Sequence, residues 1–409
     1  MGKLALGGGN LGLLLACWTL AQAQELPTTA KPSTAKPPAP MLAAKDSSHG
    51  AQPKRTPQQQ QMLLYARRGA DWLARMHDPK GRFLPGYLPA LQRASEGDNL
   101  PRQALAAAGL AHAARVLGEE AYAVRAAQTL LTLLEDTIVD PADKTCRIVD
   151  LPGDRLVRAA AAAHLVQAIC ELPQPPADLL EKAEQLTRTL AKLIQADGRI
   201  AEADVSTAGM ILCALARSHR CQPAPWKPAL VSKALSYYRS VWEKNRRLEA
   251  VYPLTIACVE CYRSNKDRQA AAFALEIQDW LLGLQYTKLD GQRLGWFGGF
   301  MAWRDGQAVE QEPDARAGAL AASLAKGVSL ARELADVQRH QQYTQALEQA
   351  VQFLLSLQYT EAGTQHFAAW YRPKVVGGFH HSPTNGDLRI DHAAQAIEAI
   401  LDWVEHMEP

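Results

Sequence analysis

Two kinds of helical pattern alternate along this chain, and the alternation limits the folds that it can adopt. One kind is amphipathic: residues 178–194 carry a single apolar stripe, and their other side carries Glu181, Arg188 and Lys192. The other kind is rich in alanine and apolar on nearly every side, so neighbouring segments must cover most of its surface. The alternation predicts two layers, with apolar helices inside and amphipathic helices around them.

The pattern predicts about twelve helices in six pairs, which recur roughly every 45 to 75 residues as an irregular internal repeat. The amphipathic helices are expected at 59–76, 119–135, 178–194, 228–243, 267–285 and 341–358. The apolar helices are expected at 102–117, 158–172, 205–216, 252–261, 315–330 and 390–404. No strand-like alternation of useful length appears between them. An open solenoid and a closed ring both satisfy this pattern.

The connections that follow the amphipathic helices are long, and a glycine before an aromatic or aliphatic residue recurs in them. These segments are Gly81-Arg82-Phe83, Gly198-Arg199-Ile200, Gly295-Trp296-Phe297-Gly298-Gly299-Phe300 and Gly377-Gly378-Phe379. The opposite connections are short, such as Leu117-Gly118-Glu119. Long loops gathered on one side favour the closed ring, and function usually lies with such loops.

In this two-layer pattern the chain, from about Gln58 to its end, resembles the α/α-toroid superfamily. That superfamily includes six-hairpin glycosidases, several polysaccharide lyases and epimerases, and terpenoid cyclases. Residues 280–285 with Gly295-Trp296-Phe297, and residues 353–358, are similar to the Gln-Trp repeats of squalene-type cyclases. The resemblance implies an all-α fold, an (α/α)6 toroid with two concentric layers. The acidic Asp-x-Asp-Asp run of the cyclases is absent, and Glu312-Pro313-Asp314 comes nearest to it.

Acids and arginines gather where the apolar helices begin. The segments are Asp98–Arg102, Asp154–Arg155, Glu202–Asp204, Glu312–Arg316 and Asp387–His392. In a closed ring these starts would point at one central funnel. Helix capping alone explains Asp98, Asp154 and Asp204. The last two segments hold more acids than capping needs, so a functional role and a capping role stay equally open there.

Carboxylates and arginines around one funnel favour sugar chemistry, because glycoside cleavage uses paired carboxylates and arginine grips a substrate carboxylate. The catalytic candidates are Asp98, Asp314, Asp387 and Asp391. The substrate-binding candidates, which are clamps, flat rings and a loop histidine, are Arg102, Arg316, Arg389, Trp296, Trp303, Trp370, Tyr371 and His380. The leading hypothesis is an exported hydrolase, lyase or epimerase acting on a glycan or uronic-acid polymer. The alternative is a non-catalytic toroid that binds an envelope polymer or a protein partner.

The long loop at 359–385 is expected to pack over the ring mouth with little secondary structure. Its His380-His381 pair would bind a metal, transfer a proton or simply lie at the surface. No metal site and no cofactor are predicted, since no phosphate loop or zincin motif occurs. The net charge of +2, without a basic stripe, argues against a nucleic-acid partner.

The N-terminus is typical of export. Residues 1–23 have the pattern of a signal peptide, with Ala21-Gln22-Ala23 as the cleavage site. A competing interpretation is a lipoprotein box ending at Cys17, which would then carry a lipid anchor. Residues 24–56, rich in Pro, Ala, Thr and Lys, predict a disordered tether before the domain at 57–409. We therefore expect a periplasmic or secreted protein, or a membrane-anchored lipoprotein; no later apolar run reaches the about 20 residues of a membrane helix.

Cysteines are few for an exported chain. Cys258 and Cys261 form a C-x-x-C motif inside an apolar helical segment, without a second pair at zinc spacing. Buried thiols are the favoured interpretation, and a disulfide between Cys213 and Cys221 is the alternative.

Overall fold

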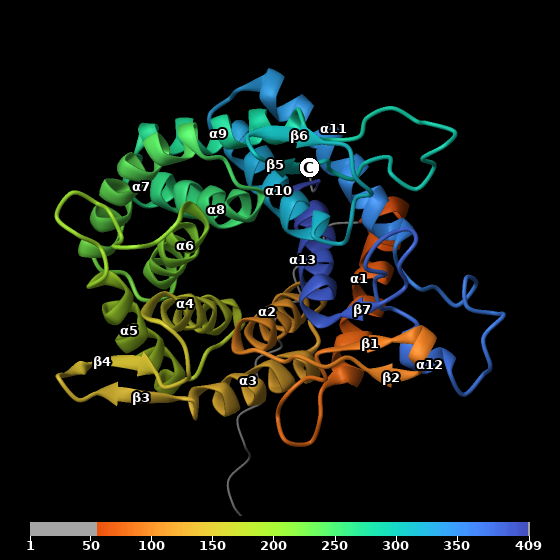
Figure 1. Ribbon diagram of the computed structural model, residues 1–409, viewed down its shortest axis with the longest axis horizontal. Helices are drawn as coiled ribbons and strands as arrows, with labels where there is room; N and C mark the ends of the chain where they lie inside the picture. Colours follow the sequence, from red (N-terminus) through yellow and green to blue (C-terminus); the bar gives the residue numbers. More distant parts are fainter. Residues whose placement is uncertain (1–54, 408–409) are drawn as a thin grey trace, which may run out of the picture. The chain divides into compact units, whose positions relative to one another are not determined.

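The computed structural model describes residues 55–407, which fold mainly into α-helices arranged as a ring (Figure 1). The inner helices are α2 (Leu100–Leu117), α4 (Arg155–Glu171), α6 (Val205–Cys221), α8 (Leu248–Asn265), α10 (Ala317–Glu333) and α13 (Ile390–His406). The outer helices are α1 (Pro57–Met76), α3 (Glu120–Leu134), α5 (Ala177–Ala191), α7 (Trp226–Lys244), α9 (Arg268–Leu282) and α11 (Val337–Ser356). Each inner helix contacts the next, and α13 contacts α2, so the ring is closed.

Small residues let the inner helices approach one another closely. A Cβ added to Gly109 of α2 would lie 2.7 Å from the Cβ of Ala394 in α13. A Cβ added to Gly318 of α10 would lie 2.8 Å from the backbone nitrogen of Ala396, also in α13. The last inner helix is therefore held between glycines of both its neighbours, which explains why this layer needs the small side chains that its sequence carries.

The outer helices bury one stripe, as their sequence pattern predicts. In α5 the side chains of Leu179, Leu186 and Leu190 are fully buried. Asp154 and Asp204 cap α4 and α6 through backbone amides, as expected for these acids. The cap of α2 is Asn99, which accepts from the amide of Arg102, so Asp98 does not cap this helix.

The recurring loop glycines join each long connection to a neighbouring outer helix. Gly81, Gly198, Gly298 and Gly377 all adopt positive φ, which side chains disfavour. A Cβ at Gly298 would collide with the carbonyl of Gln349 in α11, and one at Gly377 would collide with the carbonyl of Arg68 in α1. The last loop thus locks onto the first helix and helps to close the ring.

Short strands occur in the connections, where the sequence predicted none. The strands are β1 (Gly86–Leu88), β2 (Arg93–Ala94), β3 (Thr137–Asp140), β4 (Asp143–Val149), β5 (Ala302–Arg304), β6 (Gln307–Val309) and β7 (Leu388–Arg389). β3 pairs antiparallel with β4, β5 with β6, and β1 with both β2 and β7. Most span two to four residues, which is too short for a two-residue period to show in the sequence. A short helix, α12 (Arg372–Val375), also lies in the last loop, which was expected to have little secondary structure.

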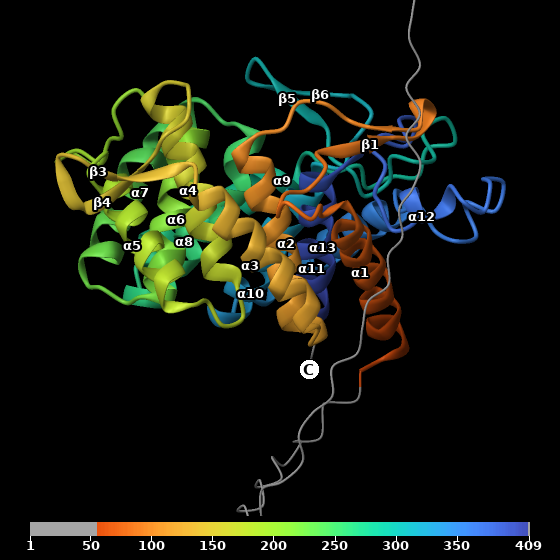
Figure 2. The ribbon, with the colours of Figure 1, turned by 90° about the horizontal axis from the view of Figure 1, so that it is seen from below.

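Two groups of the short strands lie at the same end of the helices. Figure 2 shows β1 and the β5–β6 hairpin on the same side of the helices.

Among residues 55–407, no helix combines the length and the apolar character needed to cross a membrane. All cysteines in this part of the chain are free, including Cys213 and Cys221, and Cys258 and Cys261 are buried as expected. The predicted signal peptide, most of the tether and Cys17 lie outside the described residues.

Candidate functional site

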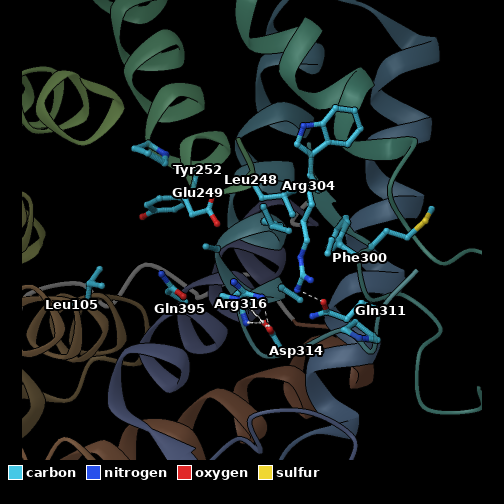
Figure 3. Close-up of a pocket in the computed structure, with 18 of the residues that line it drawn as sticks. Leu105, Leu248, Glu249, Tyr252, Phe300, Arg304, Gln311, Asp314, Arg316 and Gln395 are labelled. Carbon is cyan, nitrogen blue, oxygen red and sulfur yellow. Dashed lines mark hydrogen bonds and ion pairs between the residues drawn. The ribbon is translucent and has the colours of Figure 1, made fainter. Parts of the chain in front are cut away.

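A cavity of about 440 Å³ opens at the centre of the ring (Figure 3). Every inner helix contributes to its wall, through Leu105, His164, Met210, Glu249, Leu320 and Gln395 among others. The β5–β6 region and the segment before α10 complete the wall. The expected hollow, shared by the inner helices, is therefore present.

Asp314 and Arg316 form an ion pair on this wall. The Nε atom of Arg316 lies 2.9 Å from each carboxylate oxygen of Asp314, and Nη2 lies 2.7 Å from Oδ2. Burial alone would raise the pKa of Asp314, but the hydrogen bonds and charge of Arg316 outweigh burial, and the pKa is lowered. Asp314 is consequently ionised at neutral pH and serves as an acceptor.

Glu249, in the first turn of α8, is a second carboxylate of the cavity. Figure 3 shows Arg316 between Glu249 and Asp314. Among residues 55–407, no hydrogen bond or ion pair engages Glu249. The hydrogen bonds and charge of Asp314 raise the pKa of Arg316, and the charge of Glu249 adds a smaller contribution. The Glu249 carboxylate is exposed and lines the cavity, so a bound ligand can reach it.

Arg304 and Glu312 add charge at the cavity mouth. Arg304, in β5, donates to the amide oxygen of Gln311 and has no carboxylate partner among the described residues. Its guanidinium is exposed, so it can accept an anionic group of a ligand. Glu312 accepts hydrogen bonds from the hydroxyls of Ser382 (2.7 Å) and Thr384 (2.8 Å), which belong to the last long loop.

Aromatic rings supply the apolar part of the wall. Phe300, Trp303 and Tyr252 all line the cavity. Trp303 packs edge-to-face on Trp280, with ring centroids 5.1 Å apart, and this contact fixes its orientation. Flat apolar faces beside a few polar groups are typical of small-ligand sites, and they suit the apolar faces of sugar rings.

The floor of the cavity is a buried polar network around Arg217. Arg217 lies 3.2 Å from Glu171 and 3.3 Å from Glu398, and it donates to the hydroxyl of Tyr252. Burial and the charge of Arg217 lower the pKa of His164 to about 4, so this cavity-lining ring is neutral at pH 7. Tyr252 and His164 line the central cavity as well as the small pocket around Arg217, so the network adjoins the cavity.

Of the predicted site residues, Asp314, Arg316 and Trp303 line this cavity. Asp391, Arg389 and Arg102 form a separate cluster beside it. The Nη2 atom of Arg389 lies 2.5 Å from Asp391, and the Nε atom of Arg102 lies 3.7 Å from it. Burial raises the pKa of Asp391, but hydrogen bonding to Arg389 and nearby positive charge prevail and lower it.

Asp98 and Trp296 have structural contacts outside the central cavity. Asp98 accepts from the amide of Gln103 (2.8 Å), which also bonds both backbone groups of Phe83 and so holds the first long loop. Trp296 packs against Tyr286, with ring centroids 5.3 Å apart.

The remaining candidates gather in the last long loop. Asp387, Trp370 and Tyr371 line a second pocket of about 610 Å³. The ring of His380 lies against Tyr359 at an interplanar angle of 43°, with centroids 3.8 Å apart, whereas the ring of His381 stacks on His392 with centroids 5.4 Å apart. The two neighbouring histidines therefore pack on different partners. Burial lowers the pKa of His380.

One group at the far end of the inner helices has metal-ligand composition: His112, Asp402 and Glu405 lie within 4.8 Å of one another. Both acids already have cationic partners. Lys326 lies 2.9 Å from Asp402, and Arg115 lies 2.7 Å from Glu405. These carboxylates are thereby neutralised without a metal ion.

Solved structures share this architecture, although no family model and no curated protein sequence matches the chain. An unsaturated glucuronyl hydrolase specific for heparin aligns with a TM-score of 0.57 and 12% identity, covering 84% of this chain and 97% of that one. Cellobiose 2-epimerase from Bacillus thermoamylovorans B4167 aligns with a TM-score of 0.58 and 12% identity, covering 83% and 99%. The chain is an (α/α)6 toroid.

Other solved toroids that are similar to this chain are also named for an activity on sugars. An α-1,6-mannanase of Salegentibacter sp. HEL1_6, in complex with α-1,6-mannotetrose, has a TM-score of 0.58 and 11% identity, with 84% and 99% of the two chains covered. D-mannose isomerase has a TM-score of 0.60 and 10% identity, with 84% and 97% covered. At these identities the likeness establishes the toroid fold, and the site must be argued from this chain's own residues.

Sequence reasoning missed several polar residues of the cavity, among them Glu249, Arg304, His164 and Gln395. Glu249 was missed because α8 was predicted to begin at Tyr252, whereas it begins at Leu248. Glu249 is an acid in the first turn of α8, and acids near the helix start are the signal that singled out the other inner helices. Arg304 stands in a hairpin that the sequence did not predict.

Proposed function

We propose that this toroid is a carbohydrate-active protein whose central cavity binds the end of a glycan. The observation that carries the proposal is that one cavity holds two carboxylates in different environments. Glu249 is a carboxylate without a partner among residues 55–407, and Asp314 is a carboxylate held ionised by Arg316. Acid/base chemistry on sugars needs one group that exchanges a proton and one that stays charged.

Arg304 supports a glycan with an anionic group as the preferred substrate. Its exposed guanidinium has an amide as its hydrogen-bond partner in the described structure, so binding a carboxylate or sulfate would break no ion pair. Two aligned hydrogen bonds to such a group would orient the sugar ring against Trp303. Under this proposal Glu249 transfers the proton, Asp314 and Arg316 position the ring, and the reaction is hydrolysis, elimination or epimerisation.

A non-catalytic toroid that binds an envelope polymer or a protein is the second candidate. The specific observation in its favour is that the predicted acids Asp314 and Asp391 are both ion-paired with the arginines predicted to bind substrate. In such a protein the paired charges would recognise hydroxyls and would transfer no proton.

A panel of neutral, uronate-containing and sulfated oligosaccharides separates the two candidates. Binding would be followed by the shift of the melting temperature, and conversion by mass spectrometry. We expect binding and conversion by the wild type, binding without conversion by Glu249→Gln, and loss of binding of the anionic sugars by Arg304→Ala. Arg293→Ala, at another loop arginine outside the cavity, is the control. Binding without conversion by the wild type on every sugar would favour the second candidate.

We also propose that the protein is exported, on the strength of the signal-like residues 1–23. Cell fractionation with N-terminal mass determination tests this proposal. A mature chain that begins after Ala23 supports secretion, a lipid-modified Cys17 supports anchoring, and an unprocessed chain in the cytoplasm refutes both.

A further inference from the structure

A second pocket lies on the loop side of the toroid, apart from the central cavity. It has a volume of about 610 Å³ and lies between the turn at 89–92 and the last long loop. Its lining includes Trp370, Tyr371 and Asp387, which the sequence had singled out for the substrate site. No role in the central cavity accounts for these residues.

Trp370 offers a rigid and accessible ring in this pocket. The residue is 63% exposed, which is high for a tryptophan, yet its ring packs at 78° on Tyr371 with centroids 5.7 Å apart. Tyr371 is itself fixed, because it is buried and its hydroxyl donates to the carbonyl of Pro89 at 2.9 Å. A fixed, exposed aromatic face loses little conformational freedom when a ligand stacks on it.

The polar groups of the pocket suit a neutral ligand that is rich in hydroxyls. The carboxylate of Asp387 has no hydrogen bond or ion pair in the described part of the chain, so it can accept from two hydroxyls. Gln92 and Asn385 provide further amide groups. The residues that line the pocket include no arginine or lysine, although the ammonium of Lys374 lies 5.3 Å from the centroid of the Trp370 ring. Within the pocket the charge of Asp387 would repel an anionic sugar.

A hydrogen bond joins the two cavities. Thr384 lines the second pocket, and its hydroxyl donates to Glu312, which lines the central cavity, at 2.8 Å. Ser382 of the same loop donates to the same carboxylate. A chain whose end occupies the central cavity would therefore reach the second pocket by crossing the Glu312–Thr384 contact.

We propose that this second pocket is a distal subsite that binds neutral pyranose residues of a glycan chain, by stacking on Trp370 and hydrogen bonding to Asp387. The inference rests on the proposed function, because the chain bound here is the one whose end enters the central cavity. The subsite makes the protein prefer polymers over short oligosaccharides.

The test is affinity electrophoresis in native gels that contain soluble mannan, xylan or hydroxyethyl cellulose, with hyaluronan as the anionic comparison. The wild type should be retarded by at least one neutral polymer. Trp370→Ala should weaken that retardation about tenfold, as for loss of an aromatic anchor, and Trp370→Phe should restore most of it. Trp226→Ala, at another exposed tryptophan on α7, should behave as the wild type.

The two proposals fail in different ways. Binding of a uronate-containing disaccharide in the central cavity, followed by melting temperature, should be lost in Arg304→Ala and unchanged in Trp370→Ala. Retardation that Trp370→Ala leaves intact, or no retardation by any neutral polymer, overturns the distal subsite. Loss of disaccharide binding in Trp370→Ala also overturns it, because the ring would then act in the central cavity. Retardation that depends on Trp370, with no disaccharide bound by any variant, supports the pocket and overturns the central proposal.

Discussion

Arg316 holds Asp314 through a two-oxygen ion pair, although the arginine side chain itself is 60% exposed. The pair therefore joins a carboxylate that the protein shelters to a guanidinium that a ligand can reach. Glu249 lies on the other side of Arg316 in Figure 3. The cavity therefore holds one carboxylate, Asp314, that is ion-paired with Arg316, and a second carboxylate, Glu249, that has no ion-pair partner among the described residues.

The first prediction concerns the pKa of Asp314. In Arg316→Ala, burial acts on Asp314 without its partner, so we expect the pKa of Asp314 to rise. Carbon-detected NMR titration of the carboxyl group would measure the change. Arg389→Ala is the matched control, because it should raise the pKa of Asp391 and leave that of Asp314 nearly unchanged. A titration of Asp314 that is identical in Arg316→Ala and the wild type would show that the ion pair is not formed.

The second prediction concerns the buried network below the cavity. Arg217→Met removes the buried cation that Glu171 and Glu398 share, and leaves Glu171 with the half-exposed Arg220 and Glu398 with the hydroxyl of Tyr252. This should lower the free energy of unfolding by about 3 kcal/mol. Arg239→Ala removes a half-exposed pair with Glu276 and should cost about 1 kcal/mol or less. Urea denaturation of both variants measures the difference. Equal losses would mean that the network around Arg217 is open to water.

The third prediction concerns acid sensitivity. Burial lowers the pKa of His392 to about 4, against about 6.5 in the unfolded chain. Between these values the unfolded chain binds the proton and the folded chain does not. Titration of His392 therefore does not lower the free energy of unfolding above about pH 6.5. As the pH falls from about 6.5 toward 4, the free energy of unfolding decreases by at most about 1.4 kcal/mol per pH unit.

His392→Gln should remove this dependence. The free energy of unfolding of the variant should change less than that of the wild type between pH 7 and pH 5, measured by urea denaturation at each pH. Parallel curves for the two proteins would show that His392 has the same pKa in the folded and the unfolded chain.

The fourth prediction concerns the loop glycines that join the ring. Gly298 and Gly306 both have positive φ, but a Cβ at Gly298 meets the carbonyl of Gln349, whereas one at Gly306 meets no atom within 4 Å. Gly306→Ala should cost only the backbone strain, about 1–2 kcal/mol. Gly298→Ala should cost clearly more, because the loop must also move away from α11. Melting temperatures would show the difference, and similar values would mean that the loop does not lock onto the helix.

Much of the fold could be predicted from the sequence because the two layers leave different patterns. The largely apolar segments of α10 and α13 need neighbours on most sides, and the single apolar stripe of α5 is covered from one side. The repeated glycine before Phe83, Ile200, Phe300 and Phe379 also has a single physical cause. In each repeat the glycine meets a neighbouring outer helix, and the apolar residue pairs with the segment that ends the preceding helix.

The candidate site was harder to predict because it depends on where helices begin and how loops fold. Asp314 and Arg316 were found, since two acids before α10 exceed the needs of capping. Glu249 was missed because the predicted start of α8 was four residues too late. Arg304 was missed because it lies in a hairpin whose strands have only three residues each. Asp387 and Trp370 were predicted to belong to the same site as Asp314, but the path of a long loop, which no periodicity records, places them in a second pocket.

The most direct test of the central claim is a crystal structure of Glu249→Gln with the oligosaccharide that the wild type binds most tightly. We predict a terminal sugar ring in the central cavity, against Trp303, with its anionic group on Arg304 and a hydroxyl near the Asp314–Arg316 pair. A ligand bound elsewhere, with the central cavity holding only water, would contradict the claim.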